Sequence, residues 1–258
     1  MSHFVVLVTN TDKESVDSQL EPFCEQGDEC DSYMEKDYYL KNNEQEIDAW
    51  LLDEINSREE SLEKTEEESI KKWDAEAVKK LKKIQKIKTI NGKLKAIQKY
   101  NGGELDEEGL YWVYNPEAKY DWYTIGGRWN GWLVTNRGIE CNVCRVGDID
   151  FDGMRIKRMA DSAKFYVEET ERAKKDEREP FFWGWKKVPT IEEYIEASNR
   201  PVSSYAVLHD GKWYEKGVMG WWGISDDKYS DEEWDLEFQK FMEKLDPETE
   251  VTVVDCHI

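Results

Sequence analysis

The residues with the clearest capacity for chemistry lie between positions 115 and 132, where aromatic, glycine and isolated charged residues alternate. Lys119 and Arg128 can donate hydrogen bonds to an anion, and a guanidinium group pairs with phosphate through two parallel bonds. Gly126-Gly127 allow a tight turn or a close approach of the backbone to another group. Indole and phenol rings stack on nucleobases, so this mixture predicts a site for a nucleotide or another phosphorylated aromatic ligand.

Further candidates for this site lie outside the segment. Arg155 is expected near the start of a helix, and the paired tryptophans at 221 and 222 stand between two glycines that suit an opposite wall. The predicted ligand-binding residues are Lys119, Trp122, Tyr123, Arg128, Trp129, Arg155, Trp221 and Trp222. The alternative is structural, since tryptophans beside glycines also pack on sheet surfaces. No Gly-rich loop with a Lys-Ser/Thr ending occurs in the sequence, which excludes P-loop chemistry as a motif-based assignment.

A second constellation involves the chain ends, because two of the three histidines are His3 and His257. If the first and last strands are antiparallel neighbours, His3 lies near Asp255 and His257, which share one strand face. Two imidazoles and a carboxylate could bind a divalent transition metal and activate water, as in a metal-dependent hydrolase. The alternative is ordinary hydrogen bonding at strand ends, so the sequence leaves open whether the protein is an enzyme.

Cysteines and clustered aspartates carry weaker signals. The five cysteines are an odd number, and nothing suggests secretion, so reduced thiols are expected. Cys141 and Cys144 form a single Cys-x-x-Cys without two further zinc ligands and are predicted to be a buried or idle pair. Asp148, Asp150 and Asp152 lack the twelfth-position glutamate of an EF-hand, which favours capping of a helix that carries Arg155.

Composition limits the classes of partner. The formal net charge of −21 opposes non-specific binding to nucleic acid, because phosphate neutralisation needs clustered Lys and Arg. The same charge permits a different hypothesis, an acidic protein that imitates DNA and inhibits a host DNA-binding protein. No apolar run approaches the length that spans a bilayer, so no membrane partner and a cytoplasmic location are expected. Self-association is left open.

Local signals predict an α+β fold. A short strand at residues 4–8 precedes a helical pattern, Asp210-Gly211 predicts a hairpin, and Ser230 with Glu233 predicts a capped helix before a last strand at 251–257. This order of strand and helix, then strand, strand, helix and strand, is that of a ferredoxin-like split β-α-β core. That core is expected to consist of residues 1–23 and 203–258.

The long insertion between these parts divides by charge. Residues 44–68 contain eleven acidic and two basic residues, whereas residues 71–99 contain eleven lysines and two acidic residues. Apolar residues recur at helical spacing in both, which predicts a charged helical hairpin over residues 41–100 with an ion-paired face. Residues 101–202 are expected to form an aromatic-rich region with β structure, packed on the core, with a helix near 151–174 and a capped one at 190–197.

Several motifs together resemble those of a family of uncharacterised proteins carried by bacteriophages and some bacteria. They are the opening Met-Ser-His-Phe, the central pattern Asn-Pro-x-x-Lys-x-Asp-Trp-Tyr-x-Ile-Gly-Gly-Arg-Trp-x-Gly, residues 147–155, residues 219–223 and the closing Thr-Val-Val-Asp-Cys-His-Ile. Residues 44–99 are not part of this pattern. The resemblance implies a phage or prophage setting in the host cytoplasm but no particular activity. In that setting, a ligand-binding protein would sequester a host defence nucleotide.

Overall fold

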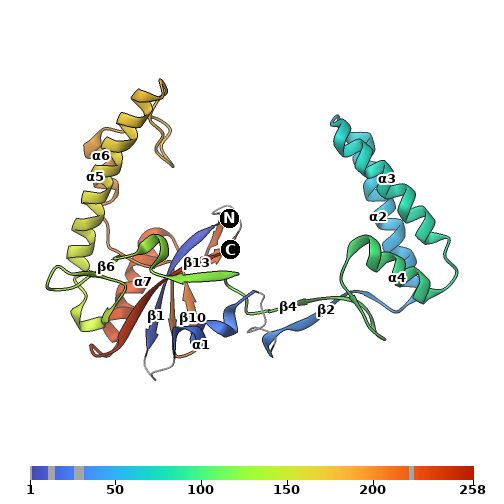
Figure 1. Cartoon of the computed structure of the whole chain (residues 1–258), viewed down its shortest axis with the longest axis horizontal. Helices are drawn as coiled ribbons and strands as arrows, with labels where there is room; N and C mark the ends of the chain where they lie inside the picture. Colours follow the sequence, from blue (N-terminus) through green and yellow to red (C-terminus); the bar gives the residue numbers. More distant parts are fainter. Residues whose placement is uncertain (1, 11–14, 26–31, 221–223) are drawn as a thin grey trace. The chain divides into compact units, whose positions relative to one another are not determined.

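The computed structural model describes residues 2–10, 15–25, 32–220 and 224–258. The protein is mixed α/β, with 47% of its residues helical and 24% in strands, which confirms the predicted combination of helices and sheets. The chain divides into two compact units, and Figure 1 shows the elements of each. We call Met1–Glu25 with Glu117–Ile258 the terminal unit, and Gln26–Pro116 the inserted unit.

A six-stranded sheet forms the centre of the terminal unit. Its strands, from one edge to the other, are β10 (Lys212–Glu215), β9 (Ala206–His209), β1 (His3–Asn10), β13 (Glu250–His257) and β5 (Trp122–Ile125), with β8 (Val143–Arg145) also paired to β13. β1 and β13 are antiparallel and place His3 opposite His257. The described ends of the chain therefore lie side by side (Figure 1), as the sequence predicted.

A ferredoxin-like core is not confirmed. In the split β-α-β arrangement, the second strand of the hairpin would lie beside β1, but here β1 pairs in parallel with the first strand, β9. The physical reason is burial. Ala206, Val207 and Leu208 are all buried, so β9 has apolar residues on both faces and suits an interior position, whereas β10 has exposed residues and forms the edge. The predicted Asp210-Gly211 hairpin is present, with positive φ at both turn residues.

Helices cover both faces of this sheet. The helix α7 (Asp231–Lys244) begins with the predicted capping box of Ser230 and Glu233 and buries Trp234, Phe238 and Met242. On the opposite face, α1 (Val16–Leu20) and the short helix η1 (Glu21–Phe23) contribute Leu20 and Phe23 to a second apolar cluster. Alternate residues of β1 and β13 enter the two clusters, as strand geometry requires.

The rest of the terminal unit surrounds the sheet. Its further elements are η3 (Gly127–Trp129), β6 (Leu133–Val134), β7 (Glu140–Cys141), η4 (Val146–Asp148), α5 (Phe151–Lys175), α6 (Ile191–Ala197), β11 (Gly217–Met219) and β12 (Ser225–Asp227). Asp150 is the N-cap of α5 and accepts the amide of Gly153, and Thr190 with Glu193 forms the capping box of α6. Both predicted caps are confirmed.

The inserted unit has its own apolar core. Its elements are β2 (Glu35–Lys41), α2 (Glu44–Lys64), α3 (Glu68–Gln85), α4 (Ile90–Asn101), β3 (Glu104–Leu105) and β4 (Gly109–Tyr114). Leu40 of β2 and Leu110 of β4 are buried in the same cluster as Leu51, Leu81 and Ile97 of the helices. The unit therefore extends beyond the helical hairpin predicted at residues 41–100, because the strands pack on the helices. No helix among the described residues is long and apolar enough to cross a membrane.

Candidate functional site

Two histidine–aspartate pairs meet where the first and last strands adjoin. His3 Nδ1 lies 2.9 Å from Asp255 Oδ1, and His257 Nδ1 lies 2.7 Å from Asp121 Oδ1. The two imidazole centroids are 4.8 Å apart in an edge-on arrangement. A carboxylate only accepts hydrogen bonds, so each Nδ1 is the donor, and Nε2 is the ring nitrogen that these pairs leave available. The predicted proximity of His3, Asp255 and His257 is thus present in the structure.

The Trp122 indole packs on this pair of histidines. It stacks on His257 with ring centroids 4.6 Å apart and an interplanar angle of 21°, and it meets His3 edge-on. His257 is only 2% exposed, and no hydrogen bond within the described ranges engages its Nε2. Asp121 and Trp122 reach this position because β5 pairs with β13 and places Trp122 opposite His257. Sequence reasoning missed Asp121, because no local pattern predicts that strand pairing.

Asp255 also connects the histidines to η3. Its Oδ2 accepts the backbone N–H of Arg128 at 2.9 Å. Gly127 has φ of +51°, and a Cβ atom there would lie 2.4 Å from Asp255 Oδ2. The close approach predicted for the Gly126-Gly127 pair is therefore to a carboxylate of the chain itself. This contact holds the backbone of Arg128 against the sheet and leaves its side chain free to point elsewhere.

Arg128 lines a cavity of about 420 Å³ formed by residues of η3, α5 and α6 and the segments that follow η3 and α6. Four aromatic side chains share this lining, namely Trp129, Trp132, Phe165 and Tyr194. Arg158 also lines it but donates to the backbone carbonyls of Ser198 and Arg200, while Lys157 pairs with Asp161. In the described part of the chain, no hydrogen bond or ion pair engages the guanidinium of Arg128.

Among the described residues, the other predicted ligand-binding residues do not line this cavity. Lys119 pairs with Glu215, with Nζ 2.7 Å from Oε1, and the Tyr123 hydroxyl donates to Asp17. Arg155 donates to Asn199 and pairs with Asp152. These partners already use the donors that were expected to bind the ligand. Trp221 and Trp222 lie outside the described residues.

The cavity residues contributed by α5 had a signal that sequence reasoning missed. Met154, Arg158 and Phe165 recur at intervals of four and seven, which places them on one helix face, together with Lys157, Asp161 and Ser162. A face that mixes cationic, hydroxyl and aromatic residues is unusual for a plain core contact. Tyr194 of α6 had no such signal, because only the packing of α6 on α5 brings it there.

The metal site predicted at His3, Asp255 and His257 stays a prediction. Among the described residues, no group of three or more His, Cys, Asp or Glu side chains is arranged to hold a metal ion. Both oxygens of Asp255 are engaged, one by His3 and one by the backbone of Arg128. Asp255 therefore orients His3 in this geometry, and of the three predicted groups only the two Nε2 atoms would be left for a metal ion.

The cysteines give a mixed outcome. Cys24 is disulfide-bonded, so the expectation of reduced thiols is wrong at that position. Cys141, Cys144 and Cys256 are free. Burial, followed by the neighbouring Cys141, raises the pKa of the Cys144 thiol to about 12, which keeps it protonated near neutral pH. A neutral thiol is a poor nucleophile, and the idle character of the Cys141–Cys144 pair stays a prediction.

No family model, no curated protein and no solved structure matches this chain. The resemblance to a phage family therefore stays a prediction. The two histidine–aspartate pairs and the cavity beside Arg128 are the features that suggest a function.

Proposed function

We propose that the terminal unit binds a small phosphorylated ligand with an aromatic group, such as a nucleotide, in the cavity beside Arg128. The observation that carries this proposal is Arg128, which lines the cavity and whose guanidinium has no hydrogen bond or ion pair in the described residues. A guanidinium recognises phosphate through paired hydrogen bonds. The four aromatic side chains supply stacking surfaces, and about 420 Å³ is within the range of small-molecule sites.

The large number of acidic residues makes an unpaired arginine notable. With 57 acidic residues in the chain, an arginine has many possible partners, and the neighbouring cations all have one. Lys157 pairs with Asp161, and Arg158 is held by carbonyl groups. Arg128 has no such partner in the described residues, so its guanidinium suits an anion from outside the chain. If the protein acts in a phage-infected cell, such binding would sequester a host signalling nucleotide.

Arg128→Ala tests this function. We expect the variant to fold normally, because the contact to Asp255 comes from the backbone N–H, which alanine keeps. We expect ligand affinity to fall by about 10- to 100-fold, because charge-assisted hydrogen bonds to the phosphate are lost. The measurement is calorimetric titration of a panel of linear and cyclic nucleotides, guided by mass spectrometry of small molecules released when the purified protein is denatured.

Arg137→Ala is the matched control. Arg137 is also exposed and has no hydrogen bond or ion pair in the described residues, but it does not line the cavity. Both variants lose one positive charge, so an equal loss of affinity would show a general charge effect and contradict the proposal. A broad panel without any binder of the wild type would contradict it as well. Recovery of a cleaved nucleotide would favour hydrolysis over sequestration.

A second candidate function, a metal-dependent hydrolase using His3, Asp255 and His257, is favoured by one observation. Histidines that bind metals usually donate their other ring N–H to a carboxylate, and both His3 and His257 do so here. The two Nε2 atoms would be two protein ligands, one fewer than the three that catalytic zinc sites usually have.

Under this second candidate, protein purified without chelator should contain about one equivalent of zinc, manganese or a similar ion. We expect His257→Ala to lose the metal, because one of two nitrogen ligands disappears. His209→Ala is the control, since the ring of His209 bonds to Thr9 at a different place in the sheet. Elemental analysis of the three proteins decides the question, and metal-free wild type would rule this candidate out.

A further inference from the structure

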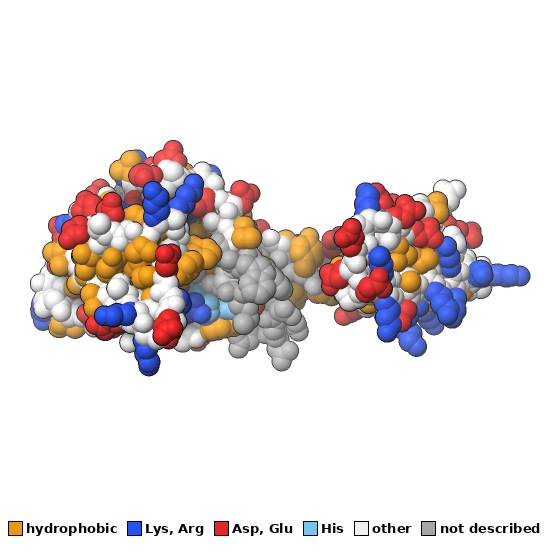
Figure 2. Space-filling view, turned by 90° about the horizontal axis from the view of Figure 1, so that it is seen from above, with side chains coloured by type: hydrophobic (Ala, Val, Ile, Leu, Met, Phe, Trp, Pro, Cys, Tyr) orange, Lys and Arg blue, Asp and Glu red, His pale blue; other side chains and the backbone are white. Residues whose placement is uncertain are grey.

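The inserted unit carries many lysines that its acidic residues do not neutralise. Of the eleven lysines between positions 71 and 99, ion pairs are formed by Lys71, Lys82 and Lys93. The side chains of the others have no ion pair or hydrogen bond within the described ranges. Figure 2 shows Lys and Arg side chains gathered on one side of this unit and acidic side chains on the other. The ion-paired face predicted for the hairpin is therefore only partly formed.

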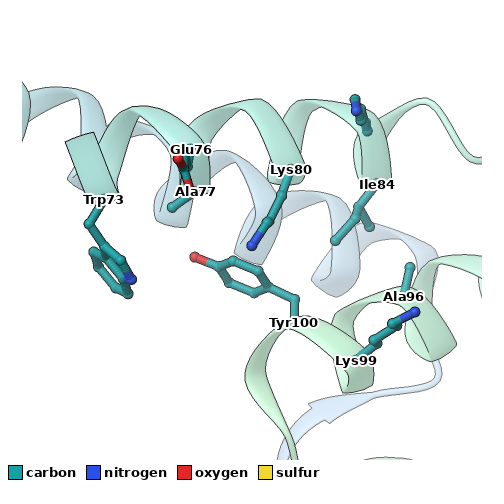
Figure 3. A pocket seen from close by; sticks show the side chains of 9 residues that line it. Trp73, Glu76, Ala77, Lys80, Ile84, Ala96, Lys99 and Tyr100 are labelled. Atoms are coloured by element: carbon teal, nitrogen blue, oxygen red, sulfur yellow. The ribbon is translucent and has the colours of Figure 1, made fainter. Parts of the chain in front are cut away.

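Three of these unpaired lysines line a groove between α3 and α4, with a volume of about 430 Å³ (Figure 3). They are Lys80 and Lys83 of α3 and Lys99 of α4. The apolar part of the lining consists of Ala77, Ile84 and Ala96, and Trp73 and Tyr100 add aromatic rings. Figure 3 shows the Lys80 side chain extending from α3 toward the ring of Tyr100. Glu76 is the single acidic residue of this lining.

The aromatic rings of the groove are accessible and held in place. Trp73 is 57% exposed, which is unusual for so large an apolar side chain. The Arg58 guanidinium lies 4.4 Å from the centroid of the Trp73 ring and fixes it by a cation–π contact. Burial raises the pKa of the Tyr100 hydroxyl further above neutral pH, where a tyrosine is a hydrogen-bond donor in any case. A ligand would therefore meet two positioned rings.

We infer that this groove is a separate binding site for a small aromatic anion, such as an aryl phosphate. The aromatic part would lie on Trp73 and Tyr100 above the apolar floor, and the anionic group would lie among Lys80, Lys83 and Lys99. Three ammonium groups against one carboxylate favour an anion. A lysine ammonium group is a flexible point charge and lacks the planar donor set of a guanidinium group. The site should therefore select for negative charge and an aromatic ring, and not for one arrangement of the anion's oxygen atoms.

Calorimetric titration of the full chain with naphthyl phosphate tests this inference. Naphthol and inorganic phosphate serve as probes that keep only the aromatic body or only the charge. We expect naphthyl phosphate to bind more tightly than either. The triple variant Lys80→Gln, Lys83→Gln, Lys99→Gln should bind it about tenfold more weakly or worse, because three attractive charges are removed. Thermal unfolding should be unchanged, since these side chains are exposed.

The matched control is Lys72→Gln, Lys79→Gln, Lys86→Gln, which removes the same charge from exposed, unpaired lysines that do not line the groove. It should bind naphthyl phosphate like the wild type. Equal weakening in both triple variants, equal binding of naphthol or of inorganic phosphate, or no binding at all would overturn the inference. Arg128→Ala should retain this binding, because Arg128 belongs to the other unit. Loss in that variant would assign the binding to the cavity of the terminal unit and overturn the groove site.

Discussion

Gly127→Ala is expected to destabilise the terminal unit by about 2 to 5 kcal/mol and to abolish ligand binding at Arg128. Gly127 has φ of +51°, a conformation that costs alanine about 1 to 2 kcal/mol. The added Cβ would also lie 2.4 Å from Asp255 Oδ2 and 2.5 Å from Asp255 Cβ. Asp255 is buried in β13, between β1 and β5, so it has little room to move.

Gly138→Ala separates the cost of the backbone conformation from the cost of the steric clash with Asp255. Gly138 has a similar positive φ of +71°, but no atom lies within 4 Å of the position of an added Cβ. This control should show only the backbone cost, so Gly127→Ala should be clearly less stable in denaturant unfolding. Displacement of Asp255 should also weaken its bond to His3, which the imidazole N–H proton resonance reports. Equal stability of the two variants would show that η3 moves away from Asp255 easily and that the two parts of the site are not coupled.

The parts of the fold that were predictable depend on residues close together in the sequence. The capping boxes at Ser230 and Thr190 involve residues three positions apart, and the Asp210-Gly211 turn is a two-residue signal. The pairing of the first and last strands followed from the order of elements. The position of β9 was misjudged, although its continuous apolar run already indicated an interior strand.

In the candidate site too, contacts between strands of expected pairing could be predicted, and other long-range contacts could not. The proximity of His3 and His257 could be predicted because both lie on strands whose pairing was expected. Asp121 could not, because it depends on β5 joining β13, a contact between residues more than 100 positions apart. Lys119 and Arg155 were expected at the ligand but found partners in Glu215 and Asn199. Sequence shows which side chains can donate, whereas only the fold shows which donors are already used.

The division into two units supports a prediction about folding. Removing residues 26–116, the inserted unit, and joining Glu25 to Glu117 through a short flexible linker should leave a folded terminal unit that still binds its ligand. The two ends are held together within that unit, since Cys24 and Tyr120 form a β-bridge and the N–H of Glu25 donates to the Tyr120 carbonyl. Of the removed part, none of the described residues, 32–116, belongs to the apolar clusters of the terminal unit.

The bounds of the deletion determine whether the remaining protein folds. A shorter deletion of residues 43–100 removes the helices of the inserted unit but leaves β2, β3 and β4, with Leu40 and Leu110 stripped of their packing partners. We expect this variant to expose apolar surface and aggregate, whereas the complete deletion costs little, because loop-closure entropy changes by only about 0.6 kcal/mol per doubling of loop length.

Thermal unfolding in the presence of reductant, which removes any difference arising from the Cys24 disulfide, compares the two deletions with the full chain. The complete deletion should unfold cooperatively, lose the part of the naphthyl phosphate binding that depends on Lys80, Lys83 and Lys99, and keep the binding that depends on Arg128. An unfolded complete deletion would show that the terminal unit needs the inserted unit for stability. A folded protein without the Arg128-dependent binding would show that the inserted unit contributes to that site, and its unpaired lysines would then be the first residues to test there.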